Sequence, residues 1–331
     1  MNRNTSRESC AKTPRTYPTL FSRSLVIVFW AALVGISVLR TPAQDRREGS
    51  ASVKVTATVD MTIEELRLNY RAELIDLEYN PSQERLDSLM REVGERVEAF
   101  FRDFSNTSSK ERVRMQRLTN NRIEVDSRTQ EFEYLILPHS GNKGVSFEEV
   151  RTDTKGRPVN PTKTAGFMIS SGYAGLCLYF HPGHHFGSRF RYLGQNTSEP
   201  RAHVIAFAQK PEVGDYLAGI SGTNPWESAS LLVQGIVWID PRSFQIVRMR
   251  TELLIPPSQS GLIEQSTDIH FSEVRFAAGR LPLVLPREVT VFWRFAGQSY
   301  RNRHRYSDYK VFTVESYDKI SPPETKPPPR Q

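Results

Sequence analysis

A change of hydrophobic period near Lys110 constrains the fold more than any other feature of this sequence. From there to about residue 316, short segments alternate apolar and polar side chains, as strands with one buried face do. Two of these segments are joined by Asp240-Pro241-Arg242-Ser243, a composition typical of a type I turn in a hairpin. Because strands that are neighbours in sequence usually pair, we expect one large antiparallel sheet. The predicted strands are 128–137, 145–150, 190–193, 204–208, 231–239, 244–254, 266–276, 286–295 and 305–316.

Two helices are predicted ahead of the sheet. Thr62 and Glu65 form a capping box that opens the first, whose apolar residues recur at helical spacing as far as Leu77. Asn80-Pro81-Ser82 ends it and begins a second helix over 84–104. The second helix is amphipathic, and we expect its broad apolar stripe to cover the sheet. The stripe consists of Leu86, Leu89, Met90, Val93, Val97, Phe100, Phe101 and Phe104.

The order of elements predicts an α+β fold, a curved antiparallel sheet (half-barrel) with the N-terminal helices packed on its concave face. One interruption, Ser171–Phe180, lacks clean alternation and predicts a short buried helix between strands. The chain divides into a leader, a linker with a short extended segment, a helical segment, a sheet that forms one domain with the helical segment, and a proline-rich disordered tail. Their ranges are 1–43, 44–59, 60–110, 111–318 and 319–331.

Two resemblances support this fold. The long leading helix, and the hairpin Gly235–Asp240, turn, Phe244–Met249, are similar to features of the half-barrel of the periplasmic lipoprotein-localisation factors A and B. Segments 101–109, 190–194 and 301–309 resemble an uncharacterised family of exported bacterial proteins, over most of residues 60–318. The resemblances imply a half-barrel fold and a location outside the cytoplasm. That family has no established activity, and the carriers work through an apolar cavity, so no binding residue transfers by sequence.

The N-terminal leader indicates export. A basic segment, Met1–Arg23, precedes an uncharged apolar run, Ser24–Leu39, and the small residues of Thr41-Pro42-Ala43 follow. Such a run is typical of a signal peptide and short for a membrane span of about 20 residues. An uncleaved N-terminal anchor is the alternative, and it would be the chain's only contact with the membrane. Taking the source as bacterial, either case places the domain in the periplasm or cell envelope.

The net charge of +7 would suggest nucleic-acid binding, but the positive charge is concentrated in the leader. Residues 1–43 hold six basic residues and one acidic residue, a net of +5, so the rest of the chain carries only +2. A domain so close to neutral has no general field to attract polyanions. We therefore expect no nucleic-acid partner.

Three histidines in five residues, His181, His184 and His185, form the sharpest local motif. Imidazole and thiolate bind zinc or copper, and Cys177 lies four residues before His181. No carboxylate stands at a fixed spacing to complete a site, so a solvated loop is favoured, and no metal or other cofactor is predicted. Cys10 falls in the leader, which leaves Cys177 without a disulfide partner in the mature chain, as a small buried apolar residue.

An arginine row lies in the segment Tyr300–Tyr306. On a strand, Arg301, Arg303 and Arg305 share one face. Guanidinium groups at this spacing suit phosphate, lipid head groups or an acidic partner. The alternative is an exposed row paired with glutamates on neighbouring strands.

Three functions are compatible with these patterns. The first is an exported, non-enzymatic carrier that binds a lipid, acyl chain or other apolar ligand in the hollow of the sheet. A second is a structural or interaction protein of the envelope with a filled core, and the third is a metal-dependent enzyme at the three histidines. No Gly-x-Ser-x-Gly nucleophile motif or glycine-rich phosphate loop is present, so we expect no enzyme. The predicted ligand-cavity residues are Val97, Phe100, Phe101, Phe104 and Trp238.

Overall fold

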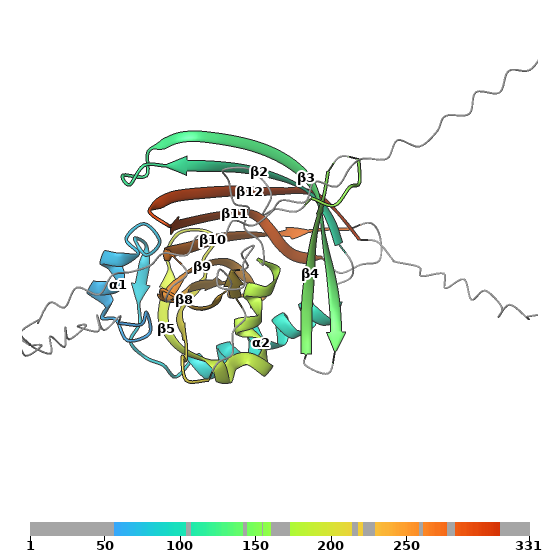
Figure 1. Ribbon diagram of the computed structural model, residues 1–331. Coiled ribbons are helices and arrows are strands. Elements are labelled where there is room, and N and C mark those ends of the chain that lie inside the picture. Colours follow the sequence, from blue (N-terminus) through green and yellow to red (C-terminus); the bar gives the residue numbers. More distant parts are fainter. Residues whose placement is uncertain are drawn as a thin grey trace, which may run out of the picture. The chain divides into compact units, whose positions relative to one another are not determined.

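One antiparallel sheet dominates the computed structural model (Figure 1) and confirms the predicted α+β half-barrel. All described residues belong to one unit, Val53–Gln331. Across the sheet the strands run in the order β1-β5-β6-β8-β9-β10-β11-β12-β2-β3-β4, and β7 pairs with β8. The structure describes residues 56–103, 107–141, 144–153, 155–159, 173–213, 218–220, 229–257, 261–276 and 282–311.

In the described part of the chain, the two α-helices precede most of the sheet, as expected, and two 3₁₀ helices follow β4. The helical elements are α1 (Ile63–Asn69), α2 (Leu86–Asp103) and the 3₁₀ helices η2 (Ala174–Phe180) and η3 (Pro182–Gly187). The strands are β1 (Leu77–Tyr79), β2 (Thr107–Leu118), β3 (Glu124–Gly141), β4 (Gly144–Thr152), β5 (Ser188–Asn196), β6 (His203–Gln209), β7 (Ala218–Ile220), β8 (Ala229–Ile239), β9 (Ile246–Ile255), β10 (Leu262–Val274), β11 (Leu283–Phe295) and β12 (Gln298–Val311).

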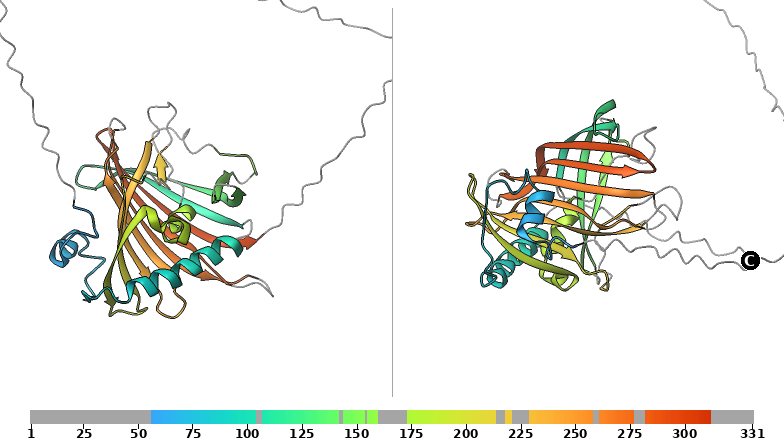
Figure 2. Two further views of the ribbon diagram at one scale, coloured as in Figure 1. Left: turned by 90° about the horizontal axis from the view of Figure 1, so that it is seen from below. Right: turned by 90° about the vertical axis from the view of Figure 1, so that its left-hand side faces the viewer.

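The hollow side of the curved sheet is covered by α2, η2 and η3, as Figure 2 shows. The apolar stripe of α2 packs there as expected, with Val93 fully buried and Phe101 4% exposed. The predicted buried helix is confirmed as η2, whose Phe180 is fully buried against Phe190 and Phe207. None of the helices in the described ranges combines the length and apolarity that a membrane span needs.

The first helix differs from the expectation, because α1 packs on the outer face of the sheet. Its Leu66 joins a second core cluster with Val204 and Ala206, whereas Ile205 and Phe207 point into the hollow. Every residue of β6 is buried. A strand that is apolar on both faces must be covered on both faces. Helix α2 therefore lies on the hollow side of the sheet, and α1 lies on the outer side.

The predicted first helix also ends sooner than its apolar spacing indicated. The capping box of Thr62 and Glu65 is confirmed, but α1 ends at Asn69, and Leu77–Tyr79 forms β1. This strand pairs with β5 at Gly194, where a Cβ atom would lie 2.0 Å from the Glu78 carbonyl oxygen. Only glycine permits this close approach of the two backbones. The helical spacing of apolar residues before Leu77 does not predict such a pairing.

The predicted hairpin joins β8 to β9 at the rim of the sheet. Asp240 caps its turn, because its carboxylate accepts hydrogen bonds from the backbone N–H groups of Arg242 (2.9 Å) and Ser243 (2.7 Å). The leader, most of the linker (44–55) and the proline-rich tail lie outside the described residues, so their assignments stay predictions.

Candidate functional site

The hollow of the sheet is largely filled by side chains in the described part of the chain. Between α2 and the sheet there is a cavity of about 40 Å³, which we call the helix cavity. Its size is far below the several hundred Å³ expected of a preformed carrier site. Its lining residues are Arg96, Val97, Phe100, Cys177, Gln245, Ile246, Phe271 and Val284.

A larger open groove, of about 740 Å³, lies beside it and extends over the outer face; we call it the rim groove. The segment Ala72–Asp76 after α1 forms one wall, and strands β9, β10 and β11 form the floor. Gln245, Phe271 and Val284 line both the rim groove and the helix cavity. The two spaces therefore meet at the edge of the sheet, next to the β8–β9 turn.

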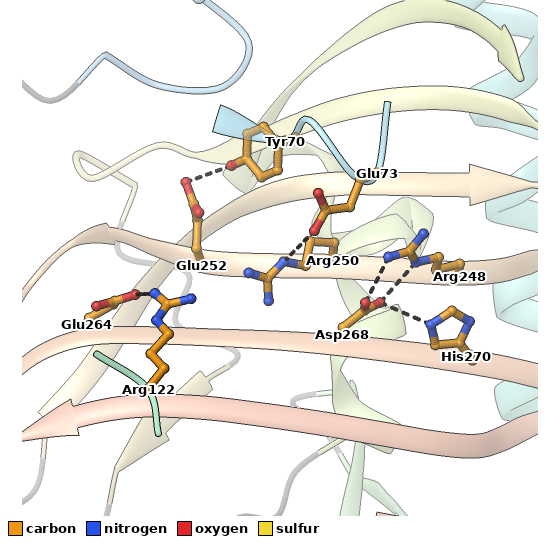
Figure 3. Close-up of polar contacts among 9 residues, drawn as sticks. All are labelled: Tyr70, Glu73, Arg122, Arg248, Arg250, Glu252, Glu264, Asp268 and His270. Carbon is orange, nitrogen blue, oxygen red and sulfur yellow. Dashed lines mark hydrogen bonds and ion pairs between the residues drawn. The ribbon is translucent and has the colours of Figure 1, made fainter. Parts of the chain in front are cut away.

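The polar floor of the rim groove is organised around Asp268 (Figure 3). Arg248 forms a two-point ion pair with this carboxylate, at 3.0 and 2.8 Å, and its guanidinium lies 4.6 Å from the centre of the Trp238 ring. His270 Nε2 lies 3.6 Å from Asp268 Oδ1. Burial would raise the pKa of Asp268, but hydrogen bonds from His270 and Arg248 outweigh it and lower the pKa. Asp268 is therefore ionised and fully engaged.

The wall of the rim groove is held to the sheet by two further polar contacts (Figure 3). Glu73 lies 3.6 Å from Arg250 on β9, and the Tyr70 hydroxyl donates to Glu252 at 2.6 Å. Burial and the neighbouring Glu252 raise the pKa of Tyr70. These contacts fix the α1 segment above β9 and thus fix the width of the groove.

Arg287 is the charged side chain that the groove leaves without a partner. It is exposed, lines the groove, and makes no hydrogen bond or ion pair with any residue that the structure describes. The register of β10 and β11 shifts where it stands, since His270 is opposite Glu288 and Phe271 is opposite Pro286. Bulges of this kind redirect side chains, often near functional sites.

The predicted cavity residues are divided among these places. Val97 and Phe100 line the helix cavity, and Phe101 is buried in the core beside them. Trp238 lies on the outer face and lines the rim groove instead of the hollow. Phe104 lies outside the described residues. That any of them contacts a ligand stays a prediction.

The three histidines are partly engaged with backbone at η3. His181 Nδ1 accepts from the Gly183 N–H at 3.1 Å, and His185 Nε2 lies 2.9 Å from the Phe180 carbonyl oxygen. Burial raises the pKa of the Cys177 thiol to about 12, so this side chain stays a neutral thiol. Within the described ranges, no group of three or more His, Cys, Asp or Glu side chains is arranged to hold a metal ion.

The arginine row lies on the outer face of β12 as its spacing predicted. Arg301 donates to Gln116 at 2.7 Å, and Arg305 lies 3.6 Å from Glu288. Arg303 is exposed and stands directly opposite Arg114 of β2. The row is therefore partly paired, and its binding of an anion or partner stays a prediction.

A buried polar network on the hollow side of β2 and β12 was missed by the sequence patterns. Glu111 forms ion pairs with Arg151 at 2.5 and 2.8 Å, and it accepts from Tyr306 at 2.9 Å and His304 Nδ1 at 2.8 Å. His304 Nε2 lies 2.9 Å from the Tyr173 hydroxyl. The only available signal was the alternation of Tyr300–Tyr306, which puts His304 and Tyr306 opposite the arginines.

These contacts assign the tautomer of His304. The carboxylate of Glu111 requires a proton on Nδ1, so the neutral ring accepts at Nε2 from Tyr173. Burial lowers the pKa of His304, which keeps the ring neutral. Burial alone would raise the pKa of Glu111, but Arg151 and His304 hold it at about 2. The network is satisfied internally, which suits a structural role.

Comparisons with known proteins give fold-level likenesses only. No family model and no curated protein matches the chain. One similar solved structure is a domain described as an outer membrane lipoprotein-sorting protein, from Vibrio parahaemolyticus, with 11% identity, a TM-score of 0.39, and coverage of 68% of this chain and 93% of that one. Another is a DUF1329 family protein from Desulfovibrio piger, with 10% identity, a TM-score of 0.37, and coverage of 70% and 95%. The first description names the same kind of protein as the resemblance in the sequence. Since both TM-scores are low, the proposals below rest on the geometry of this chain.

Proposed function

We propose that this chain is an exported, non-enzymatic envelope protein that binds an acyl-chain amphiphile at the rim of its half-barrel. The observation that carries the proposal is the junction between the helix cavity and the rim groove, which share Gln245, Phe271 and Val284. An apolar space that opens into a wider and more polar space matches a ligand with an apolar tail and a polar head. Export rests on the basic segment and apolar run that begin the sequence.

The sizes of the two spaces indicate which part of the ligand each one would hold. At about 740 Å³ the rim groove lies within the usual range for small-molecule sites, roughly 300–1,000 Å³, and takes the head. The helix cavity takes the first part of the tail. Deeper entry requires Phe100 to move, and this ring is only partly buried, unlike Phe101. The outer edge of α2 therefore acts as the adjustable wall.

A second candidate function is an interaction protein of the envelope. The filled hollow of the described part favours it, together with the exposed arginine row of Arg301, Arg303 and Arg305. In that case the rim groove would hold a segment of a partner protein, and a free amphiphile would not bind.

Blocking the shared rim is expected to weaken amphiphile binding at least about tenfold, or by ~1.4 kcal/mol. Val284→Trp places a large ring where the two spaces meet, so the tail loses its path into the helix cavity. Binding of dodecanoic acid to the protein purified from its producing host is measured by isothermal titration calorimetry. Leu68→Trp is the matched control, because Leu68 is 80% exposed and lines neither space.

The controls separate the candidate functions. Leu68→Trp is expected to bind like the wild type. Equal affinity of Val284→Trp and the wild type would contradict the assignment of the rim. Absence of binding by the wild type would contradict the proposed function and favour the interaction protein.

A further inference from the structure

We infer that the rim groove selects an amphiphile with an anionic head group, a carboxylate or a phosphate monoester, through Arg287 with His270 beside it. This inference rests on the proposed function and specifies its ligand class.

A β-bulge on β11 places Arg287 in the rim groove. Two successive residues of β10, His270 and Phe271, face Glu288 and Pro286, so Arg287 is an additional residue of β11 at this point. The ladder leaves it without a register partner. Its exposed side chain lines the rim groove together with His270 and Ser272. A guanidinium presents its N–H groups in a fork that matches carboxylate and phosphate oxygens.

The other charged side chains of the rim groove are already engaged. Arg248 is paired with Asp268, and Glu73 lies near Arg250. Glu273 accepts from the Arg275 guanidinium at 2.6 Å. The two remaining acids bind backbone: Asp240 caps its own turn, and Asp76 accepts from the Ser198 N–H at 3.4 Å. Arg287 is therefore the charged side chain that is available to a ligand, and its positive charge favours an anion in the groove.

His270 supplies a second polar contact. Its Nε2 is directed to Asp268 at 3.6 Å, so Nδ1 is the ring nitrogen left for the ligand, and the side chain is 42% exposed. Nδ1 donates to an anion when the imidazole carries both protons. Glu288, opposite His270, lies 3.6 Å from Arg305 on the neighbouring strand. This contact directs the carboxylate of Glu288 toward β12.

The apolar side chains near Arg287 indicate where the apolar tail of the ligand would lie. Phe271 and Val284 both lie on the Pro286 side of the bulge and line both spaces. An anion bound at Arg287 would therefore have the mouth of the helix cavity beside it. A free inorganic anion would use the guanidinium alone, whereas an amphiphile would use both features.

The preference of the rim groove for an anionic head group is tested with three ligands that have the same alkyl chain length. Dodecanoic acid, dodecyl phosphate and dodecan-1-ol are titrated calorimetrically into the protein purified from its producing host. We expect the two anions to bind at least about tenfold more tightly than the alcohol. Arg287→Gln should remove this preference, so that the anions and the alcohol bind with similar affinity, and Arg287→Lys should keep part of it, because the charge remains but the fork is lost. A preserved thermal midpoint checks that both variants are folded.

Arg303→Gln is the matched control, since Arg303 is also an exposed arginine without a partner among the described residues, but it lines neither space. Loss of the anion preference in Arg303→Gln rather than Arg287→Gln would move the anion to the arginine row and overturn the inference. Equal wild-type affinity for acid and alcohol would also overturn it, while the proposed function would stand. Failure of all three ligands to bind would overturn both.

Discussion

Replacing Glu111 by leucine is expected to lower the free energy of unfolding by about 3–5 kcal/mol. The carboxylate is fully buried and forms two contacts with Arg151, whose side chain is only 2% exposed. Removal of the carboxylate takes away both of these charge-assisted contacts from a buried guanidinium. It also removes the group that accepts from His304 Nδ1 and the Tyr306 hydroxyl. Breaking a buried ion pair by removing one partner costs much more than the net value of the pair.

Chemical denaturation of wild type and variants measures this effect. Arg114→Leu is the matched control, because its pair with Glu124, at 2.9 Å, is open to solvent and should contribute little to stability. The double variant Glu111→Leu, Arg151→Met should recover much of the loss, since both members of the buried pair are then apolar. A loss below about 1 kcal/mol in Glu111→Leu would contradict the described network.

The same network gives stability a defined pH dependence. The pKa of Glu111 is about 2 in the folded protein, below its ordinary value of about 4.3 in an unfolded chain. Its ionisation therefore stabilises the fold fully above about pH 4.3, and this contribution is lost as the pH falls from there toward 2. Glu111→Gln lacks this part of the acid sensitivity.

The second large effect is expected from Phe101→Ala, which should lower the free energy of unfolding by about 3–5 kcal/mol. Phe101 is 4% exposed in the hollow, and its ring meets Phe100 edge-on with centroids 5.2 Å apart. Truncation opens a cavity between α2 and the sheet, which a domain stable by only about 5–15 kcal/mol barely tolerates.

Phe100→Ala provides the comparison on the neighbouring residue. Because Phe100 is partly exposed and lines the helix cavity, its truncation should cost clearly less stability and should change the affinity for dodecanoic acid. Both quantities are measured on both variants, by denaturation and calorimetry. Equal stability losses, with no change in binding for Phe100→Ala, would show that the edge of α2 is only core packing.

The fold was predictable where one periodicity dominates. Strands such as β12 alternate, the β8–β9 turn carries Asp240 and Pro241, and α2 has a one-sided stripe, so these elements follow from local rules. The face that α1 covers was not predictable in this way. It depends on Leu66 packing against alternate residues of β6, such as Val204 and Ala206, which are far away in sequence.

The candidate site was less accessible to sequence reasoning. The helical period identified Val97 and Phe100, which do line one cavity. Trp238 was assigned to the hollow, but the pleat of β8 turns it to the outer face. Arg287 gave no signal, because its position depends on a bulge against His270, and a single register shift cannot be deduced from alternation in one strand.

Native mass spectrometry of the protein purified from its producing host shows whether an amphiphile binds at the rim. We expect a 1:1 complex with an acyl-chain species in the wild type and predominantly ligand-free protein for Val284→Trp, whose tail path is blocked. After removal of the ligand, added dodecanoic acid should restore the complex in the wild type only. A wild-type spectrum without bound amphiphile, before and after that addition, would contradict amphiphile binding at the rim.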